Sequence, residues 1–138
     1  LDAYVSNMDS PDDQDEAIVD MLWRWQCDLL GVEANGFQSL LPRNIREAMA
    51  RREQAEHQTL GLKIVPITHT RNKMLRCRTL EPLVSNVWLQ FARHLPAEYY
   101  RQFGEFIPID GAGRDDCIDA TEAAVALVRG IQKKTDAV

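Results

Sequence analysis

The spacing of apolar and polar positions divides the first part of the chain into a helix and a strand. Apolar residues repeat there at helical spacing, at Ile18, Leu22 and Trp25. We expect a core-facing helix from Ser10 to about Gln26, because a serine cap followed by proline is typical of a helix start. The next run, residues 29–33, is almost continuously apolar, which favours a parallel strand covered on both faces.

The spacing of apolar and polar positions also predicts the elements of the rest of the chain. It predicts a strand at 1–5, a helix from about 36 to 57, a strand at 61–67, a helix at 74–84, a short strand at 86–91, a helix at 97–103, an extended segment at 106–109 and a last helix from about 114. Pro42 either kinks its helix or marks its true start, and Pro66 ends its strand or places it at a sheet edge.

This order of elements predicts an α/β fold with at least part of its sheet parallel. With 138 residues, the chain has the length of one domain or part of one, and is long enough for a real core. We expect residues 1–131 to form that domain or part of a domain, followed by a polar tail at 132–138.

Composition narrows the class of protein further. Hydrophobic residues make up 45% and charged residues 27%, as in an ordinary globular protein, and no apolar run is long enough to span a bilayer. Cys27, Cys77 and Cys117 are odd in number and lack metal-binding spacing, so we expect reduced thiols in a cytosolic protein. The net charge of −5 argues against a bulk electrostatic binder of nucleic acid, but not against an enzyme whose acids hold metal ions.

Candidate chemistry gathers at the opening of the last predicted helix. Asp115, Asp116 and Asp119 follow a turn with Gly111 and Gly113. At helical spacing the acids share one face. A separate stripe should face the core: Cys117, Ala120, Ala124, Leu127 and Ile131. The alternative is that these acids only cap the helix and complement its dipole.

A further acid, Glu33, ends the predicted strand at 29–33. Ligands of open α/β sheets bind at the carboxyl ends of strands, and a Glu there is costly to bury unless it is paired or holds a metal. The loop after the strand at 61–67 should offer Arg71 and Lys73 to the same side, where either cation would suit phosphate. The alternative for Glu33 is a side chain that simply reaches solvent, and the alternative for Arg71 and Lys73 is a role as surface cations. His69 is expected to form a hydrogen bond within the loop rather than to bind a metal.

Carboxylates from separate elements are what a two-metal site requires, because two hard cations need shared oxygen ligands. Four motifs carry a resemblance in addition: residues 1–5, 31–38, 70–76 and 114–120. In this order they resemble the C-terminal nuclease domain of phage large terminase subunits, from Leu1 to about Gly130.

The resemblance implies an RNase H-like fold and a metal-dependent endonuclease that cuts concatemeric double-stranded DNA during packaging. Glu33, Asp115 and Asp116 match its catalytic acids, and Asp119 joins them as a metal ligand. The implied cofactors are two Mg²⁺ or Mn²⁺ ions. Asn72-Lys73 matches a basic motif near the site, and the expected contacts with DNA phosphates are Arg71, Lys73 and Arg76. The implied partners are DNA, the terminase small subunit and the portal protein, in the cytoplasm of a bacterial host.

The chain also departs from the family. Arg114 stands where the family usually has His, the family's first catalytic Asp has no counterpart, and Asp2 belongs to a later strand. No phosphate-binding loop of an ATPase motor is present. We therefore expect a C-terminal fragment with a partial site, weak or absent cleavage, and self-association through exposed strand edges.

Two alternatives stay open. Another RNase H-like nuclease or resolvase would share the acids without the motor. A non-enzymatic α/β interaction module would use the same acids as helix caps and surface charge.

Overall fold

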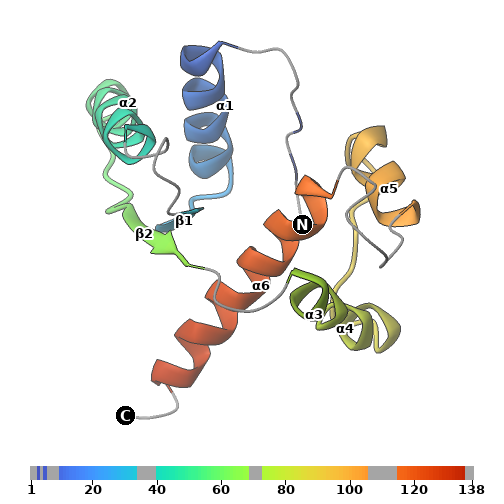
Figure 1. Cartoon of the computed structure of the whole chain (residues 1–138). Helices are drawn as coiled ribbons and strands as arrows, with labels where there is room; N and C mark the ends of the chain where they lie inside the picture. The colour runs from blue at the N-terminus through green and yellow to red at the C-terminus, as the bar shows by residue number, and fades with distance from the viewer. Residues whose placement is uncertain are drawn as a thin grey trace. The chain divides into compact units, whose positions relative to one another are not determined.

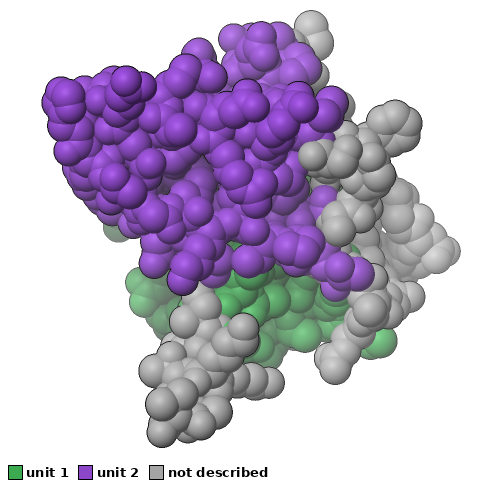
Figure 2. Space-filling model, turned by 90° about the vertical axis from the view of Figure 1, so that its left-hand side faces the viewer, with its two compact units in different colours: residues 1–5, 69–138 green, residues 6–68 purple. Residues whose placement is uncertain are grey.

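The computed structural model describes residues 3, 5, 10–33, 40–68, 73–105 and 115–135. The chain divides into two compact units: unit 1 is residues 1–5 and 69–138, and unit 2 is residues 6–68 (Figure 2). The domain expected over residues 1–131 stays a prediction.

Unit 2 contains two helices and two parallel strands (Figure 1). Its elements are α1 (Pro11–Arg24), β1 (Leu29–Glu33), α2 (Leu41–Glu56) and β2 (Lys63–Ile67). The strands pair in parallel, with Leu30 opposite Ile64 and Glu33 opposite Ile67. The parallel arrangement expected from the apolar runs is therefore confirmed for this pair.

The start of α1 is fixed by a reciprocal capping interaction. The backbone N–H of Asp13 donates to the Ser10 hydroxyl oxygen at 3.2 Å, and the Ser10 N–H donates to the Asp13 carboxylate at 3.2 Å. Two N–H groups at the helix start that lack intrahelical partners are thus satisfied, which is why Ser10-Pro11 begins the helix as predicted.

Pro42 marks the start of α2 rather than a kink within it. It lies in the first turn, where a missing N–H costs no intrahelical bond. The other end of α2 closes at His57, which adopts a left-handed conformation with φ of 53°. Pro66 lies inside β2, opposite Val32, so it does not end the strand.

The core of unit 2 forms between its helices and one face of the strand pair. Buried side chains from α1 and α2 make up its centre: Val19, Leu22, Ile45, Ala48 and Met49. Leu30 and Ile64, which are register partners in the sheet, pack against this cluster. Ile45 is fully buried, so the apolar stripes of both helices meet over the sheet as amphipathic packing requires.

In the described part of unit 1, the regular elements are all helices (Figure 1). Its elements are α3 (Lys73–Arg78), α4 (Glu81–Ser85), α5 (Ala97–Gly104) and α6 (Asp116–Thr135). Helices α3 and α5 both contact α6. The backbone of α6 continues into the segment expected to be a polar tail.

Two small apolar clusters hold unit 1 together. The first contains Cys77, Leu80, Leu83 and Ile118, and the second contains Leu95, Tyr99 and Cys117. Phe103 of α5 packs against both clusters, and Ala3 and Val5 pack against the second. Two aromatic side chains of α5, Tyr99 and Phe103, therefore serve in packing.

The single helix predicted for residues 74–84 is wrong. The chain forms α3 and then α4, separated by Thr79 and Leu80. Pro82 explains the break, because its ring would clash with the carbonyl of Arg78 in a continuous helix. The proline instead occupies the first turn of α4, where it is tolerated.

The strand predicted for residues 86–91 is also wrong. Val87 is left-handed with φ of 61°, and the N–H groups of Trp88 and Leu89 both donate to the Leu83 carbonyl, at 2.8 and 3.0 Å. These N–H groups close the end of α4 instead of pairing with a neighbouring strand. The strand was predicted from the apolar residues of this segment on the assumption that they are buried, but Val87 and Trp88 are exposed.

The predicted core-facing stripe of α6 is partly wrong. Cys117 is buried as expected, but Ala120 and Ala124 are exposed. Ile118, Thr121 and Glu122 are buried, as is Ala123. Contacts with α3 and α5 explain the difference, because they bury a face that includes polar residues.

Among the described residues the fold is a mixed α/β arrangement with a small two-stranded parallel sheet. Most of the predicted strand at 1–5, the extended segment at 106–109 and the turn with Gly111 and Gly113 lie outside the described residues. In the part that the structure describes, no helix is long and apolar enough to cross a membrane.

Candidate acidic site

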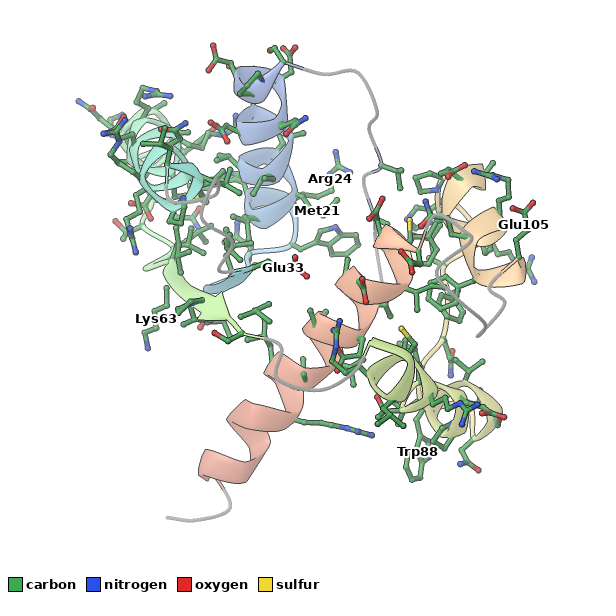
Figure 3. All side chains as sticks on the ribbon, in the orientation of Figure 1. Met21, Arg24, Glu33, Lys63, Trp88 and Glu105 are labelled. Carbon is green, nitrogen blue, oxygen red and sulfur yellow. The ribbon has the colours of Figure 1, made fainter. Side chains whose placement is uncertain are left out.

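Glu33 is the last residue of β1 and lies at the carboxyl end of the parallel strand pair (Figure 3). Its position at a strand end is the one predicted, and the residue is half-buried. Because the strands are parallel, the chain leaves β2 at this same edge of the sheet. The loop that follows, with His69 and Arg71, lies outside the described residues. Lys73 begins α3, and its side chain is also outside them.

Asp115 caps α6 through its backbone carbonyl. That oxygen accepts hydrogen bonds from the N–H groups of Ile118 and Asp119, both at 3.0 Å. Asp116 begins the helix and is exposed, whereas Asp115 is half-buried. The helix therefore opens on acids as predicted, and negative charge there is favoured by the helix dipole.

A buried glutamine of α5 also satisfies the start of α6. The side-chain oxygen of Gln102 accepts a hydrogen bond from the Cys117 N–H at 2.9 Å, and its amide nitrogen donates to Glu98 at 2.9 Å. Only 3% of Gln102 is exposed. Sequence reasoning missed this residue, since one glutamine on an amphipathic helix carries no recognisable signal.

Asp119 faces a cation instead of open solvent. The Arg76 guanidinium lies 3.4 Å from Asp119 Oδ1 and 2.8 Å from Glu122 Oε2. The exposed fractions of these side chains are 11% for Arg76, 17% for Asp119 and 11% for Glu122. One arginine of α3 thus bridges two carboxylates of α6, and a predicted DNA-binding residue is engaged by a predicted metal ligand.

Glu122 was not among the predicted site residues. Its spacing from Asp119, three positions along a helix, was a signal that the two carboxylates share a face. The sequence did not show that Arg76 would lie opposite them. At this depth an ion pair is stabilising only when its geometry is good, and removing one partner leaves an uncompensated charge.

A series of side-chain hydrogen bonds lies beside the acidic start of α6. The Tyr99 hydroxyl hydrogen-bonds with the Thr121 hydroxyl, which itself donates to the Cys117 carbonyl at 2.7 Å. Because the proton of Thr121 is used on that carbonyl, Tyr99 is the donor of the pair. Burial raises the pKa of Tyr99, and burial together with Glu98 and Asp116 raises the pKa of the Cys117 thiol.

The predicted acids come from both units. Glu33 belongs to unit 2, and Asp115, Asp116 and Asp119 belong to unit 1. Their convergence is a relation between the units and stays a prediction. In the described part of the chain, no group of three or more His, Cys, Asp or Glu side chains is placed to hold a metal ion.

The chain matches no model of a known protein family, no curated protein and no solved structure.

Proposed function

We propose that this chain is the RNase H-like part of a metal-dependent endonuclease that cuts double-stranded DNA, of the kind found in phage large terminase subunits. One observation carries the proposal: Glu33 lies at the carboxyl end of a strand in a parallel pair. A helix that opens on Asp115 and Asp116 supplies the further acids, and the four sequence motifs support the family.

The proposed metal ligands are Glu33, Asp115 and Asp116. Carboxylate oxygens are the ligands that Mg²⁺ and Mn²⁺ prefer, and Asp116 is open to solvent. Metal ions bound there would activate water and stabilise the leaving oxygen of a phosphodiester. Asp119 is paired with Arg76, so it would take part as a metal ligand only by giving up that contact.

Binding of the DNA backbone would then fall to Arg71 and Lys73. Both follow the carboxyl end of β2 along the chain, and a guanidinium and an ammonium both suit phosphate. Arg76 was also expected to contact phosphate, but its guanidinium already contacts Asp119 and Glu122. We therefore assign Arg76 a structural role next to the proposed site, with phosphate contact limited to states in which that ion pair opens.

Thermal unfolding with increasing Mn²⁺ tests the proposed site. An ion that binds only the folded chain raises the melting temperature as its concentration exceeds its dissociation constant. Glu33→Gln and Asp116→Asn should each remove most of this rise while the fold, followed by circular dichroism, is kept. Asp12→Asn, in the exposed first turn of α1, is the matched control and should leave the rise unchanged. An equal rise in all four proteins would rule out these acids as ligands.

One observation favours a second candidate, a non-enzymatic interaction module. Arg76 compensates Asp119 and Glu122, so part of the acidic helix has a structural explanation. This candidate predicts no change of melting temperature with Mn²⁺ in the wild type. The resolvase alternative would bind metal equally well, and it is separated from a terminase by whether an ATP-binding phosphate loop belongs to the same protein.

A further inference from the structure

An open groove lies within unit 1, between α3, α4 and the residues of α5 and α6 that face them. Its volume is about 560 Å³. The residues that line it are Cys77, Arg78, Leu80, Glu81, Val84, Ser85, Phe103 and Ile118. This volume is large enough to accept a bulky side chain from another molecule, and the floor is largely apolar.

Exposed apolar side chains continue from the groove past the end of α4. The exposed fraction is 41% for Val84, 63% for Val87 and 77% for Trp88. In Figure 3 the Trp88 side chain stands out from the end of α4. Val84 lines the groove, and Val87 and Trp88 follow it in the turn after α4. An exposed tryptophan is typical of a protein interface, because tryptophan contributes more binding energy than most residues.

The groove also carries one charge of each sign. Arg78 ends α3 and Glu81 begins α4, and both are exposed. Within the described residues neither side chain forms an ion pair or a side-chain hydrogen bond. A surface with one cation and one anion beside the same groove is electrostatically complementary to a copy of itself.

We propose that this groove is the interface of a two-fold dimer of the chain. Trp88 of each protomer enters the groove of the other, and Arg78 of each faces Glu81 of the other. A two-fold contact is self-complementary, so a single tryptophan and a single charge pair are each used twice. The contact rests on few side chains, so we expect a dissociation constant on the order of 1 μM.

The charges favour a second copy over nucleic acid as the occupant. The chain carries a net charge of −5, and Glu81 would repel a phosphate backbone placed against the groove. This surface is also distinct from the strand edge expected at 29–33, because β1 belongs to the other unit.

Sedimentation equilibrium of the whole chain over a range of concentrations tests the role of Trp88. Trp88→Ala should weaken the dimer about tenfold or more, since truncating an interface tryptophan removes a main contribution to binding. Trp25→Ala is the matched control, because Trp25 is also exposed (54%) but belongs to unit 2. Circular dichroism should show both variants folded.

Charge exchange gives the sharper test. Arg78→Glu alone and Glu81→Arg alone place like charges opposite each other and should each abolish the dimer. The double variant Arg78→Glu/Glu81→Arg should restore it. An equimolar mixture of the two single variants should also dimerise, because each then supplies the charges that the other lacks.

Three outcomes would overturn the proposal. The first is a wild-type chain that stays monomeric at concentrations well above the micromolar range. The second is a Trp88→Ala dimer whose dissociation constant equals that of the wild type, which would place the contact elsewhere on the chain. The third is a mixture of single charge variants that stays monomeric while each variant is folded.

Discussion

Arg76 neutralises two carboxylates that share a face of α6. Its guanidinium is within 3.4 Å of Asp119 and 2.8 Å of Glu122, and none of the three side chains is more than 17% exposed. Water screens such charges poorly, so the arginine matters more than a surface ion pair would. The interaction also ties α3 to α6, two elements that are far apart in the sequence.

We expect Arg76→Met to lower the free energy of unfolding by about 3–5 kcal/mol, because the largely buried carboxylates of Asp119 and Glu122 would then lack a compensating cation. Urea titration followed by circular dichroism measures the change. Adding Asp119→Asn and Glu122→Gln to the same variant should restore much of the loss, since the repulsion is gone. Arg101→Met, which removes an exposed arginine paired with Glu98 and Glu105, is the control and should change little. A small effect of Arg76→Met would show that the pairing is not structural.

We expect the buried Cys117 thiol and Tyr99 hydroxyl to make the stability of the fold sensitive to alkaline pH. Burial raises the pKa of Cys117 above the ordinary thiol value of 9.0, and raises the pKa of Tyr99 above 10.0. As the pH rises, the unfolded chain releases these protons before the folded chain does. The contribution of the two groups to the free energy of unfolding is therefore fully present below pH 9.0 and is lost as the pH rises through their folded-state pKa values.

Unfolding by urea across the alkaline range checks this expectation. Cys117→Ala should flatten the first part of the decline, and Tyr99→Phe should flatten the part above pH 10.0. Tyr99→Phe should also cost about 1 kcal/mol at neutral pH, because the hydrogen bond to Thr121 is lost. Stability that rises between pH 9 and 11, or an identical decline in both variants, would contradict the assignment.

At the scale of the elements, local sequence signals decided where helices begin and end. Ser10-Pro11 starts α1 and Pro42 starts α2, because serine caps N–H groups and proline has none to lose. Pro82 divides one predicted helix into α3 and α4, because its ring would clash with the carbonyl of Arg78 in a continuous helix. The turn after α4 instead places a β-branched residue, Val87, in a left-handed conformation.

Val87→Gly should stabilise the chain by about 1 kcal/mol. A left-handed conformation is costly for a β-branched side chain and easy for glycine, and Val87 is 63% exposed, so little packing is lost. Thermal unfolding measures the difference. Val128→Gly is the matched control: Val128 is 56% exposed but lies within α6, so glycine there should destabilise the chain by roughly 0.3–0.5 kcal/mol. Destabilisation by Val87→Gly would mean that the turn is not strained.

At the scale of the whole molecule, the proposed nuclease needs acids from both units. Glu33 is supplied by unit 2, and Asp115 and Asp116 by unit 1. The family that the motifs resemble uses one more acid, for which this chain has no matching residue. Two-metal hydrolysis needs both ions fixed, so we expect Glu33, Asp115 and Asp116 without that acid to hold the ions too loosely for efficient cleavage.

We therefore expect little or no nicking of supercoiled plasmid by this chain with Mn²⁺, even when metal raises its melting temperature. Agarose gel electrophoresis with and without Mn²⁺ is the measurement, with Asp116→Asn as the reference for background cleavage. Strong nicking that disappears in Asp116→Asn would support the nuclease but show that its acids are complete in this chain.

The sequence by itself determined the features that depend on neighbouring residues. The capped start of α1, the parallel strand ending at Glu33 and the acidic opening of α6 were all predicted, because caps, apolar runs and helix-start acids act within a few positions. The structure confirms that Glu33 is the last residue of its strand, and this position could be predicted without knowing any tertiary contact.

Only the tertiary structure decided which side chains meet. Arg76 was predicted to contact DNA and Asp119 a metal, yet they lie within 3.4 Å of each other. Gln102 satisfies the start of α6 from another helix, and the exposed Trp88 lies in a turn that was predicted to be a strand. These features depend on how α3, α4 and α5 pack around α6, and packing between distant segments leaves no periodic signal in a single sequence.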